Sequence, residues 1–186
     1  MAGRRWLIIP ASIILLAGTL LLAACEVEDP VTYPPPPPGD DDVGPRDPGL
    51  TVGPALGQLA PDFTLVDTGG VDRTLSSYRG QVVVLFFWFM GCPYCEQELA
   101  GVQAIHTDHA GDVQVLGLNF YATASQIETY LAGFGCTFPN LLCDPAVQSA
   151  YGITEVPHSL VIDTEGVVRF NGHTASVTDA LLQGLI

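Results

Sequence analysis

A short cysteine motif, placed between a predicted strand and a predicted helix, constrains the fold most. The motif, Cys92-Pro93-Tyr94-Cys95, follows the unbroken apolar run 82–87, which is typical of a central strand covered on both faces. From about Pro93 to His106 the apolar residues have helical spacing. Unpaired N–H groups and the dipole at the start of a helix stabilise an anion such as a thiolate. The chain must therefore fold so that a buried strand delivers a dithiol to the start of a helix.

The spacing of the two cysteines allows a small-ring disulfide that forms and breaks reversibly. Cys92, the earlier and more exposed residue, is predicted to be the nucleophile, and Cys95, one turn into the helix, to resolve a mixed disulfide. A static disulfide is the first alternative. A structural zinc site is the second, but it needs a further pair of closely spaced ligands, and Cys136 and Cys143 do not form one. We expect no metal and no cofactor.

Strands and helices alternate from residue 56 to the C-terminus. A β-hairpin comes first, and the order β-α-β-α-β-α-β-β-α follows, which is typical of an α/β sandwich with a mixed central sheet. The hairpin is an N-terminal extension of that sandwich. The expected strands are 63–66, 71–74, 82–87, 113–119, 140–143, 159–162 and 167–170, and the expected helices are 93–106, 125–134, 145–151 and one from about Val177.

The N-terminus has the features of a secretory signal. Arg4 and Arg5 precede the apolar stretch 6–22, and small residues follow before Cys25. A membrane-spanning anchor is the alternative, since the stretch is at the lower limit for a span. The ending Leu22-Ala23-Ala24-Cys25 resembles the bacterial lipobox, in which the cysteine carries the lipid. We therefore predict a signal peptide over 1–24, lipidation at Cys25, and an exported chain on the periplasmic or outer side of a bacterial membrane.

A tether is predicted over residues 25–55, between the lipidated cysteine and the domain at 56–186. This stretch holds most of the chain's 15 prolines, a run of aspartates and almost no large apolar residue. Such a composition cannot bury enough surface to offset its ordering entropy, so we expect disorder with extended polyproline character. A spacer that holds the domain away from a membrane is the expected role.

The charge of the chain excludes one class of partner. It has 20 acidic residues against 6 basic ones, a formal net charge of −14. A surface of this sign repels phosphate backbones and anionic headgroups, so we expect no nucleic-acid partner and no electrostatic attraction to a membrane.

Several segments resemble the thioredoxin-like fold of the AhpC/TSA-redoxin superfamily, and more narrowly the membrane-anchored TlpA/ResA-type thiol-disulfide oxidoreductases. The segments are 60–65, 75–81, the strand and cysteine motif from Val82 through Trp88 to Glu98, and 153–157 with 160–166. The resemblance implies a thioredoxin-like three-layer sandwich with Cys92 as nucleophile and Cys95 as resolving thiol. It also implies exported protein thiols and disulfides as substrates, apocytochromes among them, and a membrane redox partner. We expect reduction rather than oxidation, by a monomer.

The resemblance assigns further roles around the cysteine pair. Pro157 matches the family's cis-proline, which faces the pair and offers the backbone of Val156 to the substrate. Glu98 matches an acidic residue that moves protons for the resolving thiol, with a solvated helix glutamate as the alternative, whereas Glu96 is expected to face solvent. The chain departs from the family at Gly91, where a tryptophan usually precedes the first cysteine. Further substrate contacts are expected from Trp88, Pro93, Tyr94 and His158.

Two other functions stay open at this point. Thiolates and an imidazole suit copper, so Cys92, Cys95 and His158 resemble the ligands of Sco-type copper-delivery proteins, although those have three residues between the cysteines. A peroxiredoxin-like peroxidase is the second alternative. Its signature has a proline and a threonine or serine before the reactive cysteine, where this chain has Leu85 and Phe89.

Two cysteines remain outside the motif. Leftover cysteines of an exported protein often pair, and the residues between Cys136 and Cys143 include a turn. A structural disulfide is therefore favoured over two free thiols that point apart.

Overall fold

The computed structural model describes residues 49–186, so the predicted signal peptide, Cys25 and most of the predicted tether lie outside the described residues. A mixed five-stranded sheet organises this part of the chain, with strand order β5-β4-β3-β6-β7. β3, β4 and β5 run parallel, and β6 and β7 are antiparallel to their neighbours. The strands are β3 (Val82–Trp88), β4 (Val113–Asn119), β5 (Asn140–Leu142), β6 (His158–Ile162) and β7 (Val168–Gly172).

The central strand β3 is buried along its whole length, as its unbroken apolar sequence predicts. Because side chains alternate along a strand, Leu85 and Phe87 pack into the core on one face of the sheet, and Val84 and Phe86 pack into the core on the other. The strand lies in register between β4 and β6, with Val84 opposite Val115 and Val161. This double coverage fixes where the strand ends and the cysteine motif begins.

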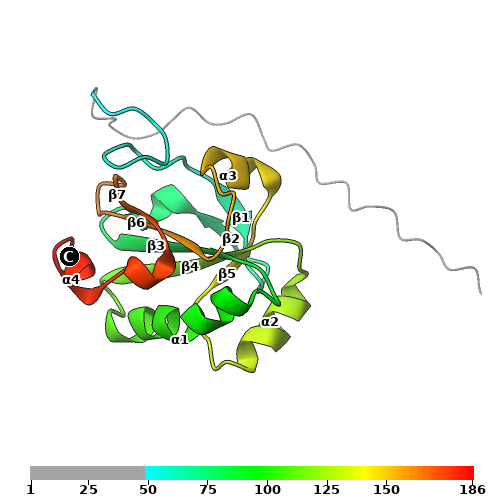
Figure 1. Ribbon diagram of the computed structural model, residues 1–186. Helices are drawn as coiled ribbons and strands as arrows, with labels where there is room; N and C mark the ends of the chain where they lie inside the picture. The colour runs from blue at the N-terminus through cyan, green and yellow to red at the C-terminus, as the bar shows by residue number, and fades with distance from the viewer. Residues whose placement is uncertain (1–48) are drawn as a thin grey trace, which may run out of the picture. The chain divides into compact units, whose positions relative to one another are not determined.

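Two layers cover the sheet, one on each face (Figure 1). One layer contains α1 (Pro93–Asp108), α2 (Ala124–Ala132) and α4 (Asp179–Gln183). The other contains α3 (Pro145–Ala150) and the antiparallel hairpin of β1 (Thr64–Val66) and β2 (Asp72–Thr74). Short 3-10 helices, η1 (Leu75–Tyr78) and η2 (Thr174–Ser176), complete the fold. The three-layer sandwich and the N-terminal hairpin expected from the sequence are both present.

Side-chain caps start the helices that cover the sheet. Thr123 accepts the N–H of Gln126 and forms a reciprocal capping box at the start of α2. Asp144 accepts the Val147 N–H at the start of α3, with Pro145 in the first turn, and Thr178 accepts the Leu181 N–H at the start of α4. The sulfur of Cys92 takes this position at α1. The helix on which the motif lies therefore begins at the motif itself.

The predicted element order is confirmed, and the ends of the expected elements differ by one or two residues from the structure. The 3-10 turn η2 was not predicted, because its three residues carry no periodic pattern. At the end of the predicted tether, residues 51–55 contact the domain. The Gly53 N–H donates to the Leu59 carbonyl, and the Leu59 N–H donates to the Thr51 carbonyl. Asn171 Nδ2 donates to the Pro54 carbonyl over 2.8 Å.

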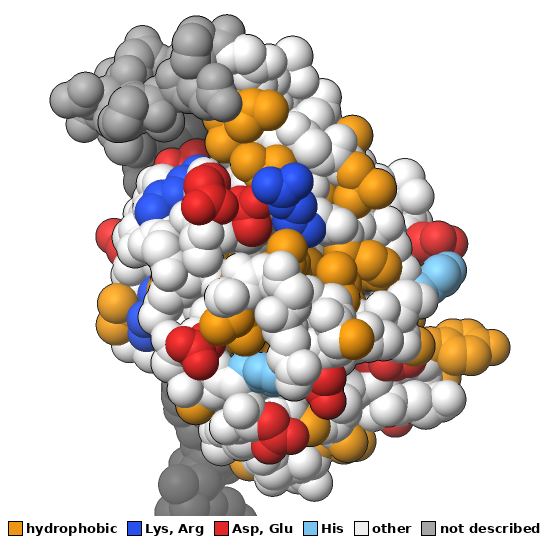
Figure 2. Space-filling model, turned by 90° about the vertical axis from the view of Figure 1, so that its left-hand side faces the viewer, with side chains coloured by type: hydrophobic (Ala, Val, Ile, Leu, Met, Phe, Trp, Pro, Cys, Tyr) orange, Lys and Arg blue, Asp and Glu red, His pale blue; other side chains and the backbone are white. Residues whose placement is uncertain are grey.

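Two of the three arginines of the described domain are bound to acidic side chains. Arg169 is paired with the buried Asp163, and Arg73 is paired with Asp67. Burial opposes ionisation of Asp67, but hydrogen bonds from the Val71 N–H and the Arg73 guanidinium outweigh it and lower the pKa of this carboxyl. Figure 2, which faces the edge opposite the cysteine motif, shows arginine side chains beside acidic ones.

None of the helices within residues 49–186 combines the length and the hydrophobicity that a membrane span needs.

Candidate active site

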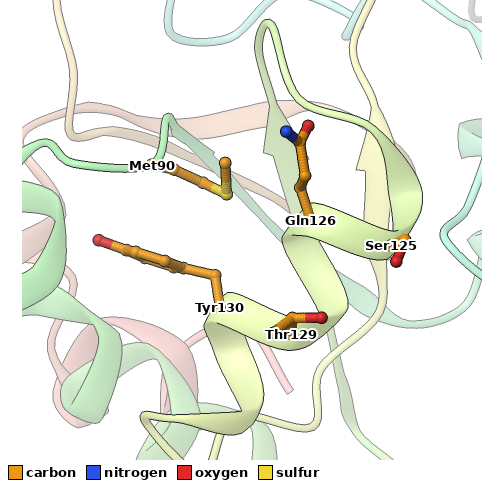
Figure 3. A pocket seen from close by; sticks show the side chains of 5 residues that line it. All are labelled: Met90, Ser125, Gln126, Thr129 and Tyr130. Atoms are coloured by element: carbon orange, nitrogen blue, oxygen red, sulfur yellow. The ribbon is translucent and has the colours of Figure 1, made fainter. Parts of the chain in front are cut away.

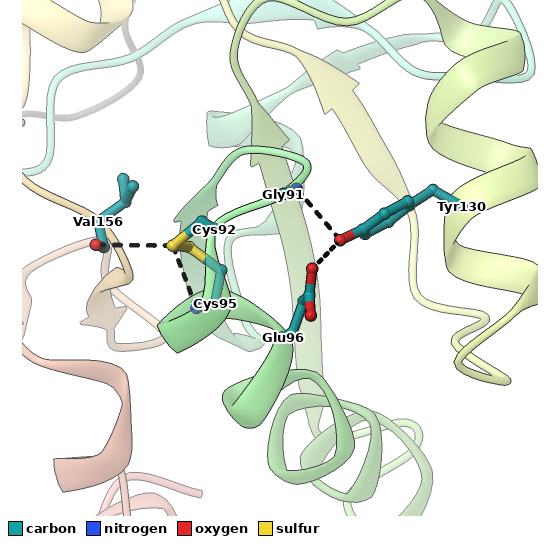
Figure 4. Close-up of a disulfide and its surroundings, with 6 residues drawn as sticks. All are labelled: Gly91, Cys92, Cys95, Glu96, Tyr130 and Val156. Atoms are coloured by element: carbon teal, nitrogen blue, oxygen red, sulfur yellow. Dashed lines mark hydrogen bonds between the residues drawn. A yellow bond between two sulfur atoms is a disulfide. The ribbon is translucent and has the colours of Figure 1, made fainter.

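The cysteine pair lies where β3 ends and α1 begins, and it forms a disulfide (Figure 4). The Cα atoms of Cys92 and Cys95 are 5.2 Å apart, within the range of ordinary disulfides. The Cys95 N–H donates to Cys92 Sγ over 3.2 Å, so this sulfur is the N-cap acceptor of the helix. The same N–H would stabilise a thiolate at Cys92 after reduction. Within residues 49–186, no backbone N–H donates to the sulfur of Cys95.

Both sulfurs are more enclosed than the sequence suggests. The expectation that Cys92 is exposed is wrong, because its exposed fraction is 4% and that of Cys95 is 1%. The carbonyl of Val156, in the bend just before β6, lies 4.0 Å from Cys92 Sγ and contributes to this enclosure. Only a small part of the Cys92 surface is therefore accessible.

The Val156–Pro157 peptide bond is cis, as the resemblance implies. It precedes β6, and the register places His158 opposite Phe87 near the end of β3. This pairing brings the backbone of Val156 to the cysteine pair, as Figure 4 shows. Val156 and Pro157 are half-buried, whereas Pro93 and Tyr94 are exposed at the start of α1. The four residues expected to contact a substrate thus lie in two places beside Cys92: the start of α1 and the segment just before β6.

Trp88 does not belong to the surface of the site. Its side chain is fully buried, and its indole N–H donates to Asn140 Oδ1 over 2.9 Å. Gly117 on β4 makes room for this bond, because a Cβ there would clash with the Asn140 side chain. The predicted substrate contact from Trp88 is therefore wrong: this last residue of β3 points into the core, where it stacks on Phe86 and Tyr130.

Glu96, rather than Glu98, is tied into the site by hydrogen bonds. The Gly91 N–H donates to the hydroxyl of Tyr130 over 3.1 Å, and that hydroxyl donates to Glu96 Oε1 (Figure 4). Glu96 is thus half-buried and hydrogen-bonded, so the prediction that it faces solvent is wrong. Glu98 is half-buried, and its carboxylate makes no hydrogen bond with residues 49–186.

Tyr130 is a residue that the sequence analysis missed in this role. Its place in α2 follows from the apolar spacing of that helix, which predicts burial and gives no sign of the hydroxyl's partners. Burial, and then the hydrogen bond to Glu96, raise the pKa of Tyr130, so the hydroxyl keeps its proton at neutral pH. Gly91 has a φ of +77°, a conformation that favours glycine, and this orients its N–H toward the ring.

His158 is directed away from the cysteine pair. Its Nε2 lies 2.6 Å from Asn171 Oδ1 on β7. Among residues 49–186, no three His, Cys, Asp or Glu side chains are placed so that they could hold a metal ion together. The three ligands of the copper hypothesis are therefore not assembled in this arrangement of side chains.

Cys136 and Cys143 do not form the disulfide that the sequence favours. Both are free thiols. Cys136 packs into the core under α1 and directs its sulfur toward the Leu99 carbonyl, 3.8 Å away. Cys143 packs into the core on the other face of the sheet. Burial raises the pKa of Cys136, and burial with the charge of Asp144 raises the pKa of Cys143 to about 12.

Comparisons with known proteins agree with this geometry. A CxxC disulfide at the N-terminus of α1, with a cis-proline just before the neighbouring strand β6 of a mixed sheet, defines a thioredoxin-like protein. Residues 56–171 match the model of the AhpC/TSA family, so the chain belongs to that family.

Among the relatives and solved structures of similar fold are thiol-disulfide oxidoreductases and thiol:disulfide interchange proteins. The chain is 33% identical over 117 residues to "Thiol-disulfide oxidoreductase ResA" of Geobacillus thermodenitrificans, covering 62% of this chain and 67% of that one. It is 30% identical over 127 residues to "Thiol:disulfide interchange protein DsbE" of Allochromatium vinosum, covering 66% and 69%. A thiol:disulfide interchange protein from Chlorobium tepidum shares the fold, with a TM-score of 0.62 and 22% identity over 70% of this chain and 97% of that one. The chain is an oxidoreductase of the thioredoxin type.

The thiols outside the motif should be nearly inert. After reduction of the full chain, we expect iodoacetamide at pH 8 to modify Cys143 at least about a hundredfold more slowly than a free cysteine, because a thiol with a pKa of about 12 has little thiolate there. Peptide mass spectrometry measures the rates, and the same reaction in concentrated urea is the control. A peptide that links Cys136 to Cys143 in the unreduced protein would contradict the structure.

The hydroxyl of Tyr130 should contribute to stability. Tyr130→Phe keeps the stacking on Trp88 but leaves the Gly91 N–H and the Glu96 carboxylate without their partner. We expect the free energy of unfolding to fall by about 1–2 kcal/mol in urea titrations of the oxidised chain. Tyr94→Phe is the matched control, because that ring is 71% exposed, and its effect should stay within about 0.5 kcal/mol. Equal effects of the two substitutions would be inconsistent with the network.

Proposed function

We propose that this oxidoreductase acts mainly as a reductase of disulfides in exported proteins. The observation that carries the direction is the charge around the cysteine pair. The start of α1 stabilises a thiolate at Cys92, but two carboxylates, Glu96 and Glu98, lie within the first turns of the same helix, and His158 binds Asn171 instead of facing the pair. A dithiol is strongly oxidising when its reduced form is strongly stabilised. Here the acidic side chains offset that stabilisation, which favours a reducing pair.

Each turnover moves two electrons from the chain to the substrate. The Cys92 thiolate attacks one sulfur of the substrate disulfide, so a mixed disulfide forms and the first substrate sulfur leaves as a thiolate. Cys95 then loses its proton and attacks Cys92 Sγ. The Cys92–Cys95 disulfide forms, the mixed disulfide breaks, and the second substrate sulfur leaves. The two protons of the enzyme dithiol end on the two substrate thiols.

The residues around the pair support this sequence of steps. The Cys95 N–H bound to Cys92 Sγ favours Cys92 as the attacking group. The carbonyl of Val156 and the cis-Pro157 offer an extended backbone beside the sulfur, where the substrate chain would lie. Glu98 is half-buried three residues after Cys95 and is the proposed acceptor of the Cys95 proton.

The cellular setting of the proposal rests on the N-terminal sequence. A signal peptide over 1–24, a lipid on Cys25 and a proline-rich tether would hold the domain near the outer face of a bacterial membrane. A membrane dithiol protein would reduce the Cys92–Cys95 disulfide again after each turnover. Exported cysteine-containing proteins, including apocytochromes, are the proposed substrates of a monomeric enzyme.

Single-cysteine variants test the assigned roles. Cys95→Ser should accumulate a mixed disulfide between Cys92 and a substrate polypeptide, because the resolving thiol is missing, and dithiothreitol should release it. Cys92→Ser should form no such adduct and should reduce substrate disulfides only at the background rate. Non-reducing gel electrophoresis and a disulfide-reduction assay measure the two effects.

Cys143→Ser is the matched control, since that thiol takes no part in the proposed cycle. Its activity should equal that of the unmodified chain. Full activity of Cys92→Ser would disprove the proposed function, because the proposed cycle begins with attack by the Cys92 thiolate on the substrate disulfide.

A further inference from the structure

A shallow hollow lies between the loop after β3 and the exposed side of α2 (Figure 3). It has a volume of about 310 Å³, enough for a side chain of moderate size. Met90, from the loop after β3, extends toward α2, and the ring of Tyr130 lies below it, as Figure 3 shows. The remaining lining comes from one face of α2, from Ser125, Gln126 and Thr129.

The hollow shares its wall with the redox site. Met90 stands two residues before Cys92, so their Cα atoms are at most about 7 Å apart. The ring of Tyr130 lines the hollow, and its hydroxyl accepts the Gly91 N–H from the same loop. A polypeptide that reaches Cys92 along an extended backbone would therefore pass the hollow within about two residues of its own cysteine.

Exposed aromatic rings surround this edge of the sheet. Phe89 follows β3, Tyr94 lies in the first turn of α1, and Tyr121 follows β4, with exposed fractions of 38%, 71% and 90%. Tyr121 also has a φ of +67°, which non-glycine residues rarely adopt and which tends to occur at functional sites. Because β3 and β4 are parallel, their ends meet at one edge, where apolar surface is expected to bind a partner.

The same edge is acidic. Glu96 and Glu98 lie on α1, the exposed Glu128 lies on α2, and the exposed Glu155 precedes the cis-proline. The described domain contains no lysine and three arginines, Arg73, Arg79 and Arg169. Arg79 packs against Gly166 in the β6–β7 turn and Arg169 binds Asp163, so both lie at the opposite edge, while Arg73 binds Asp67. A segment bound beside Cys92 would thus meet negative charge without a compensating cation.

We propose that the hollow is a specificity pocket for the substrate polypeptide. It takes an apolar side chain about two residues from the substrate cysteine, in an extended segment that carries positive charge. The inference rests on the proposed function and names its substrate class. The continuity of the hollow with the loop of Cys92 argues for a substrate segment as the occupant, and the acidic edge argues for a basic one.

Matched peptides test the pocket. Each peptide has lysines at both ends and one cysteine, which forms a mixed disulfide with glutathione. One peptide has Leu at the two positions that lie two residues before and two residues after the cysteine, and the other has Ser at both. Stopped-flow measurements with the reduced full chain give the second-order rate constants of reduction. We expect the Leu peptide to react about tenfold faster, because burial of one leucine side chain supplies at least that factor. Replacing the lysines by glutamates should slow the reaction several-fold at low salt.

Thr129→Phe places a ring in the hollow from the exposed face of α2 and should bring the Leu/Ser ratio of rate constants close to one. Met90→Ser removes the opposite apolar wall and should also lower the Leu/Ser ratio. It serves as the test if Thr129→Phe fails to fold. Ser149→Phe, which adds the same ring on the exposed face of α3 across the sheet, is the matched control and should keep the ratio.

The outcomes separate the two proposals. A ratio near one for the unmodified chain, or a ratio that Thr129→Phe leaves at about ten, overturns the pocket. Failure of both peptides and of glutathione disulfide to oxidise the reduced chain would instead disprove the proposed oxidoreductase cycle. A faster reaction of the glutamate-flanked peptides would overturn the preference for a basic segment.

Discussion

Burial of β3 on both faces is the constraint on which the rest of the structure depends. All seven residues of the strand are buried, and strands β4 and β6 lie in register on its two sides. The strand thus cannot slide without exposing apolar residues or burying polar ones, and its end is fixed. At that end the chain turns at Gly91, and Cys92 becomes the cap of α1. The pairing with β6 also brings the Val156 carbonyl to the same sulfur.

The sequence predicted the fold and the redox pair well because both depend on local patterns. The apolar run of β3, the helical spacing after Pro93 and the cysteine motif each specify an element without knowledge of its neighbours. The partners of polar groups could not be predicted in this way. Glu96 and Glu98 have similar sequence surroundings, and only the position of Tyr130, which lies 34 residues from Glu96, distinguishes them. Trp88 likewise lies inward because its strand alternates in phase with Phe86, and Cys136 and Cys143 fail to pair because the sheet separates them.

The redox chemistry and the proposed recognition of substrate share one loop. Residues 89–92 connect the buried strand to the helix, and this segment supplies the nucleophile, the wall of the hollow and the N–H bound by Tyr130. Acidic side chains around it act on both properties. In our proposals they oppose build-up of negative charge at Cys92, which would favour a reducing pair, and they attract basic segments of a substrate.

The reduction potential of the Cys92–Cys95 pair shows whether the pair is reducing. The full chain would be equilibrated with thiol redox buffers of known potential, and the fraction oxidised would be read by thiol alkylation and mass spectrometry, with Cys143→Ser as the reference variant. We expect one reversible two-electron step near or below about −250 mV, the range of reducing thioredoxin-type pairs. A value near about −120 mV, typical of a strong oxidant, or the absence of a reversible step would contradict it.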